Sequence, residues 1–369
     1  MKRRLPFLLA VSMLHSAIAL DMDFFDRLLR VKSVTSDVAQ CNEAVELTRN
    51  HLEKFGVRCA LETDENGRKA LWASTRPGKT ADYVIAVHLD VVPAEDDMFV
   101  PRIEGDWICA RGAIDCKGQA MIAIDLLKEL NGKSSVGVIF ATDEETGGLT
   151  TKMMVERGYV PRKMAIIIDY SLHGVAYAHK GNSYITVRSR GIAGHSSRAY
   201  MLVNPIEKMM EGFMKVRSQW PKCTPDGWCD ILVPTIVKAG VAGNQVPETS
   251  EMVVNLRFIK GESLERALEL LKSVGGFEIV NVRTTGFPVE SDINHPEMRR
   301  LLAMRRAKWP DEECSFVKVM SVNDARHFAK LDIPIAIVGA IGRGAHGRDE
   351  ACRISTIREN IEVLGEFLK

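Results

Sequence analysis

Five residues of the chain could together bind metal ions. They are two histidines and three acidic residues: His88, Asp115, Glu145, Asp169 and His346. Imidazole nitrogens mixed with carboxylate oxygens suit Zn, Co or Mn, whereas a set of carboxylates alone would indicate Mg or Ca. Because one carboxylate can bridge two ions, these side chains are enough for a centre of two divalent metal ions, with zinc as the first choice.

A pair of adjacent carboxylates, Glu144 and Glu145, follows a predicted strand. Neighbouring side chains at a strand end point in different directions, so one can bind a metal ion while the other transfers a proton. By itself, an acidic run closed by Gly147 and Gly148 is more typical of a solvated turn, and a lone His-x-Asp such as residues 88–90 is usually structural. It is the combination of these residues that indicates a catalytic metal centre.

Most of the chain has the pattern of an α/β domain with a mostly parallel sheet flanked by helices, because short apolar runs alternate with stretches of helical periodicity. Four apolar runs predict strands, and each precedes candidate residues: 83–87 (His88), 136–140 (Glu144 and Glu145), 164–168 (Asp169) and 335–338 (the loop of His346). Ligands gather at the carboxyl ends of strands in open α/β sheets. The sequence therefore predicts that these residues converge.

A helix is predicted after Asp115. Ala123, Leu126, Leu127 and Leu130 are spaced at i, i+3, i+4 and i+7, which predicts a helix with one buried face. Asp115 precedes the first turn of this helix, where the helix dipole stabilises a carboxylate.

The pattern changes between residues 183 and 288, where segments 184–188 and 252–257 alternate at strand period around a helical stretch, 204–220. This predicts an inserted α+β domain. The catalytic domain then comprises residues 22–182 and 289–369, and residues 1–21 are expected to lie outside the fold.

The first residues allow two interpretations. Lys2, Arg3 and Arg4, an apolar stretch to residue 20 and the small residues of segment 17–19 resemble a signal peptide, which would imply export. Alternatively, translation begins at Met22, which opens an amphipathic helix, and the protein is cytoplasmic. The second interpretation is preferred, and no later segment is long and apolar enough to span a membrane.

Charge and cysteine content bear on the expected partners and on disulfides. The formal net charge is +1 and no basic run follows the first few residues, which disfavours nucleic-acid and anionic-membrane partners. The eight cysteines include no CxxC pair, so a disulfide scaffold is not expected and reduced thiols are the simpler interpretation, although an even number still permits bridges.

Three segments resemble the metal-site motifs of the M20 peptidase family: residues 88–94 (HLDVVPA), 111–118 (RGAIDCKG) and 142–145 (TDEE). Residues 191–197 (GIAGHSS) resemble its lid-domain histidine motif, and residues 243–257 resemble its Asn-x-x-Pro and Arg segment. Residues 345–350 (AHGRDE) resemble its terminal ligand motif. The resemblance covers nearly all of residues 22–369. That family includes deacetylases, desuccinylases, aminoacylases, carboxypeptidases and dipeptidases.

The resemblance implies a ligand arrangement. Asp115 would bridge both ions, His88 and Asp169 would complete one site, and Glu145 and His346 would complete the other. Two such ions would polarise an amide carbonyl and activate a water molecule.

The resemblance also implies roles for residues that do not bind metal. Glu144 would be the general acid/base, and Asp90 would fix the tautomer of the first histidine ligand. His195 would stabilise the oxyanion, and since the equivalent histidine of dimeric relatives comes from the partner subunit, a homodimer is implied. Asn244 and Arg257 would hold the backbone and carboxylate of the substrate, although Arg257 could equally be a surface charge at a strand edge.

Departures from the family pattern bear on the substrate. Cys116 replaces the usual Met and is interpreted as a packed residue, and Val87 replaces a common Gly. Asp169 stands where deacetylases often have Glu and dipeptidases often have Asp, which favours a short peptide over an N-acyl amino acid. A catalytically silent binding protein would have lost a ligand or the base, and a metalloaminopeptidase of related architecture would lack the inserted domain. Neither alternative fits as well.

Overall fold

The computed structural model describes residues 20–224 and 227–369. The predicted leader falls mainly on residues 1–19, which lie outside the described residues. The expectation that residues 20 and 21 also lie outside the fold is wrong. Leu20 is 5% exposed and belongs to the main hydrophobic core. Asp21 is the N-cap of helix α1 (Met22–Arg30), where its carboxylate accepts a hydrogen bond from the backbone N–H of Phe24 at 2.9 Å.

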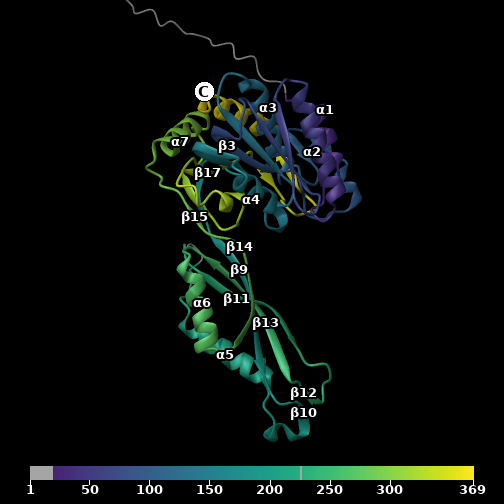
Figure 1. The fold of residues 1–369 in the computed structure, drawn as a ribbon, viewed down its shortest axis with the longest axis vertical. Coiled ribbons are helices and arrows are strands. Elements are labelled where there is room, and N and C mark those ends of the chain that lie inside the picture. The colour runs from purple at the N-terminus through teal and green to yellow at the C-terminus, as the bar shows by residue number, and fades with distance from the viewer. Residues whose placement is uncertain (1–19, 225–226) are drawn as a thin grey trace, which may run out of the picture.

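The molecule has two parts that follow one another along its long axis (Figure 1). We call residues 181–286 the inserted domain and the remaining described residues the main domain. The chain leaves the main domain at strand β9 (Gly181–Arg190) and returns to it after strand β14 (Glu278–Gly286). The termini of the described chain both lie in the main domain.

The main domain is built on a nine-stranded sheet. Its strands, in spatial order, are β1 (Arg58–Thr63), β2 (Lys69–Ser74), β6 (Val136–Ala141), β3 (Thr80–His88), β7 (Val160–Ile168), β17 (Ile335–Val338), β8 (Val175–His179) and β15 (Val289–Glu290), with β16 (Phe316–Val319) also paired to β8. The four central strands, β6, β3, β7 and β17, are parallel to one another, whereas β1, β2 and β15 pair antiparallel. The predicted α/β fold class is confirmed.

Helices cover both faces of this sheet. Alternate residues of β3 point to opposite faces, with Ile85 in one hydrophobic cluster and Val84 in another. The first cluster contains residues of α1, α2 (Val38–Glu53), α3 (Lys117–Leu130), α7 (Pro296–Lys308) and α8 (Ile354–Phe367). The second contains Met154 of α4 (Leu149–Glu156) and Ala325 of the 3-10 helix η4 (Asp324–His327). The main domain therefore has three layers.

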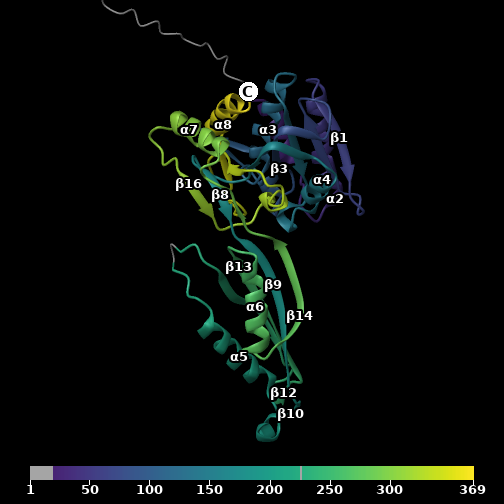
Figure 2. The same cartoon turned by 60° about the vertical axis from the view of Figure 1, so that its left-hand side comes forward.

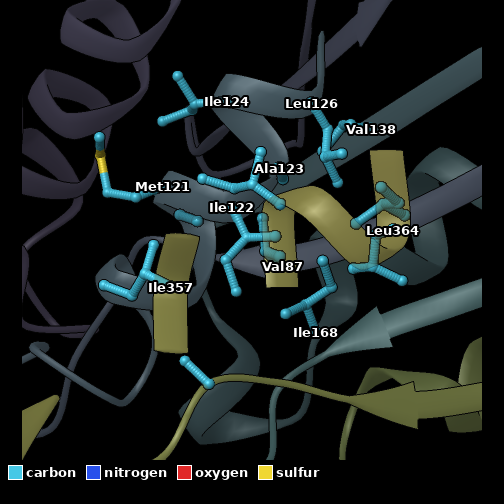
Figure 3. Packing of buried hydrophobic residues seen from close by; sticks show 14 of the residues in the cluster. Val87, Met121, Ile122, Ala123, Ile124, Leu126, Val138, Ile168, Ile357 and Leu364 are labelled. Atoms are coloured by element: carbon cyan, nitrogen blue, oxygen red, sulfur yellow. The ribbon is translucent and has the colours of Figure 1, made fainter. Parts of the chain in front are cut away.

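Helix α3 confirms the predicted helix but is more buried than predicted. Met121 and Ile124 are as fully buried as the apolar stripe that contains Ala123 and Leu126. Figure 3 shows side chains of α3 directed both toward strand residues such as Val138 and toward Leu364 of α8. Because α1, α2 and α8 pack on α3 in addition to the sheet, the helix is buried around most of its circumference.

The inserted domain has its own sheet, with the order β11 (Ile231–Ala239), β13 (Thr249–Phe258), β9 and β14. One face packs on α5 (Pro205–Gln219) and α6 (Glu262–Ser273) through a separate hydrophobic cluster, as Figures 1 and 2 show. The short strands β10 (Gly194–His195) and β12 (Gln245–Val246) form an antiparallel pair at the end farthest from the main domain. The predicted helix and both predicted strands of this region are present, and Asn204 caps α5.

The cysteines differ from the expectation of reduced thiols, because Cys223 and Cys229 form a disulfide between α5 and β11. Their Cα atoms lie 5.8 Å apart, and Gly227 N–H donates a hydrogen bond to the Thr224 carbonyl at 3.0 Å. The other six cysteines are free. Within the described ranges, no helix has both the length and the apolar character needed to cross a membrane.

Candidate metal centre and active site

All five predicted metal ligands meet at one edge of the main sheet. His88 ends β3, Glu145 lies in the 3-10 helix η2 (Glu144–Thr146) that follows β6, and Asp169 directly follows β7. Asp115 lies two residues before α3, and His346 lies in the loop between β18 (Gly342–Arg343) and β19 (Ala351–Arg353). The central strands are parallel, so their carboxyl ends reach the same edge and bring residues from distant segments together.

The five side chains form two groups that share Asp115. In the first group, His88 Nε2 lies 3.1 Å from Asp115 Oδ1 and 3.7 Å from Asp169 Oδ1. In the second, His346 Nε2 lies 3.0 Å from Asp115 Oδ2 and 3.1 Å from Glu145 Oε2. The two oxygens of Asp115 therefore face different histidines, which is the arrangement of a bridging carboxylate.

The donor set fits divalent cations. Two ligand atoms bound tetrahedrally to zinc at about 2.0–2.1 Å are about 3.3 Å apart, close to the distances within each group. Glu145 Oε1 is buried and has no hydrogen-bond partner among the described residues, so it is free to bind an ion. Asp115 and Glu145 raise the pKa of His346 to about 10, because their carboxylates stabilise a positive charge there. The residues present therefore suit two adjacent divalent ions.

Asp90 connects the first histidine ligand to the Glu144–Glu145 turn. His88 Nδ1 lies 3.0 Å from the Asp90 carbonyl oxygen and 3.3 Å from Asp90 Oδ1, so either oxygen can accept its N–H and direct Nε2 toward the metal site. The buried Asp90 carboxylate also accepts a hydrogen bond from Thr35 Oγ1 at 2.7 Å and from the backbone N–H of Glu144 at 3.2 Å. Burial alone would raise the pKa of Asp90, but these partners lower it and keep the carboxylate ionised.

Glu350 holds the loop of the shared ligand. Its Oε1 accepts hydrogen bonds from the backbone N–H groups of Ile114 and Asp115, each at 3.2 Å. Its Oε2 forms a buried ion pair with Arg111, which donates a second hydrogen bond to the His346 carbonyl at 3.0 Å. One buried pair therefore fixes the backbone on both sides of the second ligand group.

Truncation of Glu350 tests this support. Glu350→Ala would leave Arg111 buried without its partner, and breaking a buried pair in this way costs about 3 to 5 kcal/mol. We expect a clearly lower Tm and weaker metal binding, measured by calorimetry and metal titration. The matched control is Asp97→Ala in the exposed Asp97–Arg348 pair, which should change neither quantity much. Equal effects of the two substitutions would contradict the role of Glu350.

The predicted general base, Glu144, is held by an arginine that the sequence analysis did not single out. Arg326 Nη2 lies 2.9 Å from Glu144 Oε1 and donates to the Glu144 carbonyl at 3.3 Å. Asp324 and His327 in turn hold Arg326. Its Nη2 lies 3.3 Å from Asp324 Oδ1, and its Nε donates a hydrogen bond to His327 Nε2 at 3.1 Å. Burial raises the pKa of Glu144 well above its usual range, although Arg326 acts in the opposite direction. A carboxylate with a raised pKa suits a residue that must take up and release a proton.

A cavity of about 760 Å³ lies over the metal-ligand groups. Asp115, Glu144 and Asp169 line it from the main domain, and Arg257 and Arg283 line it from the inserted domain. Arg257 projects from β13, which is paired on both sides, so it is not a charge on a strand edge. The predicted substrate-binding arginine is thus at the cavity.

His195 and Asn244 lie elsewhere. Both are at the tip of the inserted domain, where the Asn244 carbonyl accepts a hydrogen bond from Ser196 N–H at 2.9 Å, and neither lines the cavity. His195 is exposed, and its Nδ1 accepts a hydrogen bond from the Ser197 backbone N–H at 3.2 Å. An accepting Nδ1 leaves the proton of a neutral imidazole on Nε2, which can then donate to a group outside this chain.

Cys116 is fully buried beside the shared ligand, and its thiol donates to the Ile168 carbonyl at 3.2 Å. Burial raises the pKa of this thiol far above its usual value, so the thiolate is not accessible. This agrees with the interpretation of Cys116 as a packed residue.

Sequence reasoning missed four supporting residues: Thr35, Arg326, Arg111 and Glu350. The last two stand inside the quoted motifs, so their charges within otherwise apolar and glycine-rich segments were an available signal. Thr35 and Arg326 lie far along the chain from the residues that they hold, and no local pattern marks them.

Comparison with known proteins agrees with this geometry. Residues 84–369 match the sequence family described as Peptidase family M20/M25/M40. The chain is 23% identical to a succinyl-diaminopimelate desuccinylase from Nautilia profundicola, over 94% of this chain and 97% of that one.

Two solved structures share the fold. An aminopeptidase from Bacillus cereus has a TM-score of 0.78 at 16% identity, covering 94% of this chain and 96% of that one. An M20 family metallo-carboxypeptidase from Sulfolobus solfataricus has a TM-score of 0.76 at 17% identity, covering 94% and 98%. The family match spans more than half of the chain and agrees with the resemblance seen in the motifs. The chain therefore belongs to peptidase family M20/M25/M40 and is a metal-dependent hydrolase of amide bonds.

Proposed function

We propose that this chain uses two zinc ions, which cobalt or manganese could replace, to hydrolyse an amide bond in a short peptide or an N-acyl amino acid. The observation that carries the proposal is the position of Asp115, whose two oxygens face two separate histidine–carboxylate groups. His88 and Asp169 would bind one ion, and Glu145 and His346 the other.

The bound ions would supply Lewis-acid chemistry that polarises the amide carbonyl and activates a water molecule. Glu144 takes the proton from the attacking water and later gives it to the leaving amine nitrogen. Arg326 holds the Glu144 carboxylate at the cavity wall, which limits its motion between the two proton transfers. Asp90 orients His88 and the Glu144 turn together, so the base and one metal ligand keep a constant relative position.

His195 would enter the cavity of a second copy of the chain. Its imidazole can donate Nε2–H to the negative charge that develops on the carbonyl oxygen. Within one chain it lies in β10, at the end of the inserted domain away from the main domain (Figure 1), so under this proposal a second chain would complete the active site. Asn244, beside His195, would reach the substrate in the same way.

The inserted domain has a surface suited to such a dimer. Strand β11 is an edge strand, and its Ile236 and Val237 are 50% and 61% exposed. Next to it on α5, Met210 and Met214 are 65% and 66% exposed and line an apolar groove of about 260 Å³. Contiguous exposed apolar side chains beside a free strand edge favour pairing with an identical surface.

Two substrate classes remain in competition. The desuccinylase relative removes an acyl group, which favours an N-acyl amino acid. The structural neighbours named above are peptidases, and Asp169 replaces the Glu that is common in deacetylases. Both observations favour a short peptide. A catalytically silent binding protein is the non-enzymatic alternative, but each ligand position and the base are occupied by residues able to act.

Metal analysis tests the proposal. The purified protein should contain close to two Zn, Co or Mn ions per chain, and a chelator should abolish hydrolysis in a panel of N-acetyl, N-succinyl and dipeptide substrates. Readdition of zinc should restore the rate. Full activity after complete metal removal, measured with elemental analysis on the same sample, would refute the proposal.

A further inference from the structure

The face of the inserted sheet that lies away from α5 and α6 carries a row of polar side chains. On β9, Ile185 and Val187 point into the hydrophobic cluster with the helices, so the even-numbered residues point to the opposite face. Tyr184 and Arg188 belong to this second face. The end of the row near the main domain lines the cavity over the metal ligands, whereas its other end does not.

Arginines at the two ends of this row differ in their partners. Away from the cavity, Arg188 Nη2 lies 2.5 Å from Glu251 Oε1, and Arg190 Nε lies 2.9 Å from Glu278 Oε2. At the cavity, neither Arg257 nor Arg283 has a carboxylate oxygen within 4.0 Å among residues 20–224 and 227–369. Two guanidinium groups without anionic partners therefore face the substrate cavity.

Each of the two guanidinium groups is positioned by a different side chain. Arg283 lies over the ring of Tyr184, with its guanidinium carbon 4.7 Å from the ring centroid. Arg257 Nε instead donates to Asn255 Oδ1 at 3.3 Å, and Asn255 donates to Asn182 Oδ1 at 2.7 Å. Both supports limit the motion of the arginine that they contact, so each guanidinium is prepared to bind a separate anion.

The strand register separates their backbones. Arg257 is opposite Asn182 and Arg283 is opposite Tyr184, on the two strands that flank β9. The two arginines are offset by two residues along the strand direction and by two strand spacings across the sheet. Their Cα atoms are therefore about 12 Å apart. Arg257 is half-buried and Arg283 is exposed, so Arg257 lies at the more enclosed position.

We propose that Arg283, stacked on Tyr184, is a specificity-determining residue that binds a second carboxylate of the substrate, apart from the carboxylate bound by Arg257. The substrate is then a linear amide with two carboxylates, one next to the cleaved bond and one several bonds away. This inference rests on the proposed function, because it assumes that the cavity binds the amide that is cleaved. Arg326, the third arginine at the cavity, is already paired with Glu144 and is not available for this role.

Matched substrate pairs test the inference. One pair is N-succinyl-alanine and its analogue in which the distal carboxylate is a carboxamide, and the other is the dipeptides Glu-Ala and Gln-Ala. The wild-type protein should prefer the acid member of at least one pair in kcat/KM by about tenfold or more. Arg283→Gln should remove about 10- to 100-fold in kcat/KM from that acid member and leave its neutral partner within about threefold.

Three further variants separate recognition from folding. Arg190→Gln, which removes an arginine paired with Glu278 away from the cavity, should leave the preference unchanged. Arg283→Lys keeps the charge but not the planar group, and Tyr184→Ala removes the ring beneath it. Both should reduce the preference by smaller factors than Arg283→Gln. Binding of the same ligands to the inactive Glu144→Gln protein, measured by calorimetry, gives a readout independent of turnover.

The outcomes separate this inference from the proposed function. Equal wild-type rates for acid and neutral members, or equal losses for both in Arg283→Gln, would overturn the role of Arg283 while metal-dependent hydrolysis stands. Absence of hydrolysis for every substrate with zinc present would overturn the proposed function. In that case, calorimetry compares the affinity of the Glu144→Gln protein for the acid ligand with that of the Glu144→Gln/Arg283→Gln double variant. An unchanged affinity would overturn the binding role of Arg283 as well, and a tenfold loss of affinity would support it.

Discussion

Replacing Glu144 by glutamine is expected to lower kcat by about a hundredfold to ten-thousandfold while leaving the bound metal in place. Glutamine has the same shape as glutamate, and its amide oxygen can still accept the hydrogen bond from Arg326, which is 2.9 Å from Glu144 Oε1. It cannot take a proton from water at neutral pH. The loss should therefore fall on the chemical step and spare the fold.

The neighbouring residue is the matched control. Glu145→Gln removes a charged donor whose Oε2 lies 3.1 Å from His346 Nε2, so it should reduce the metal content as well as the rate. Elemental analysis and thermal unfolding of both variants, together with steady-state kinetics, separate the two roles. If Glu144→Gln loses as much metal as Glu145→Gln, the assignment of base and ligand within this pair is wrong.

The second large effect is expected for His195→Ala, which should lower kcat by about a hundredfold to a thousandfold, equivalent to about 3 to 4 kcal/mol. A donor that acts on the developing oxyanion contributes more to the transition state than to substrate binding, so kcat should fall rather than KM simply rise. His195 is exposed, and among the described residues its side chain forms hydrogen bonds only with Ser197, so its removal should change Tm little.

Hybrid dimers test whether His195 acts across the interface. Mixing inactive Glu144→Gln chains with inactive His195→Ala chains should restore part of the activity, because one active site of each hybrid combines an intact base with an intact histidine. Subunit exchange must be confirmed independently, for example by mass spectrometry of the mixed sample. If exchange occurs and no activity returns, the histidine does not act in trans.

A simpler alternative for His195 is that it only caps the turn that begins η3 (Ser196–Met201), since its Nδ1 accepts the Ser197 N–H at 3.2 Å. In that case His195→Ala would keep kcat within a few-fold and lower Tm modestly. Kinetics and calorimetry on the same preparation therefore decide between a catalytic and a structural role.

The main sheet and its ligands follow closely from the sequence. The segment 335–338 coincides with β17, and the strands predicted before His88 and Asp169 lie within β3 and β7. These strands are buried on both faces, so their apolar runs are continuous and their ends are marked by the first polar residues. Since parallel strands place those ends at one edge, convergence of the metal ligands could be predicted without knowing any contact.

Other features depend on which segments meet in space, and local sequence patterns do not contain that information. The pairing of Arg326 with Glu144 joins residues 182 positions apart. The burial of α3 around most of its circumference required α8, which is the last helix of the chain. The disulfide between Cys223 and Cys229 required their Cα atoms to lie 5.8 Å apart, which spacing alone does not specify.

The sequence by itself therefore determined the α/β class and predicted the five candidate metal ligands, because strongly apolar strands and the polar residues that follow them are visible in it. The choice of Glu144 as the candidate base came from the resemblance to the M20 motifs. Only the tertiary structure decided which charged residues are neutralised and which remain available for a substrate. Arg188 and Arg283 look alike in the sequence, yet register places Arg188 beside Glu251 and places Arg283 beside Tyr184 at the cavity. The physical reason is that the energy of a charge depends on its neighbours within a few ångströms, and those neighbours are set by strand pairing and domain position.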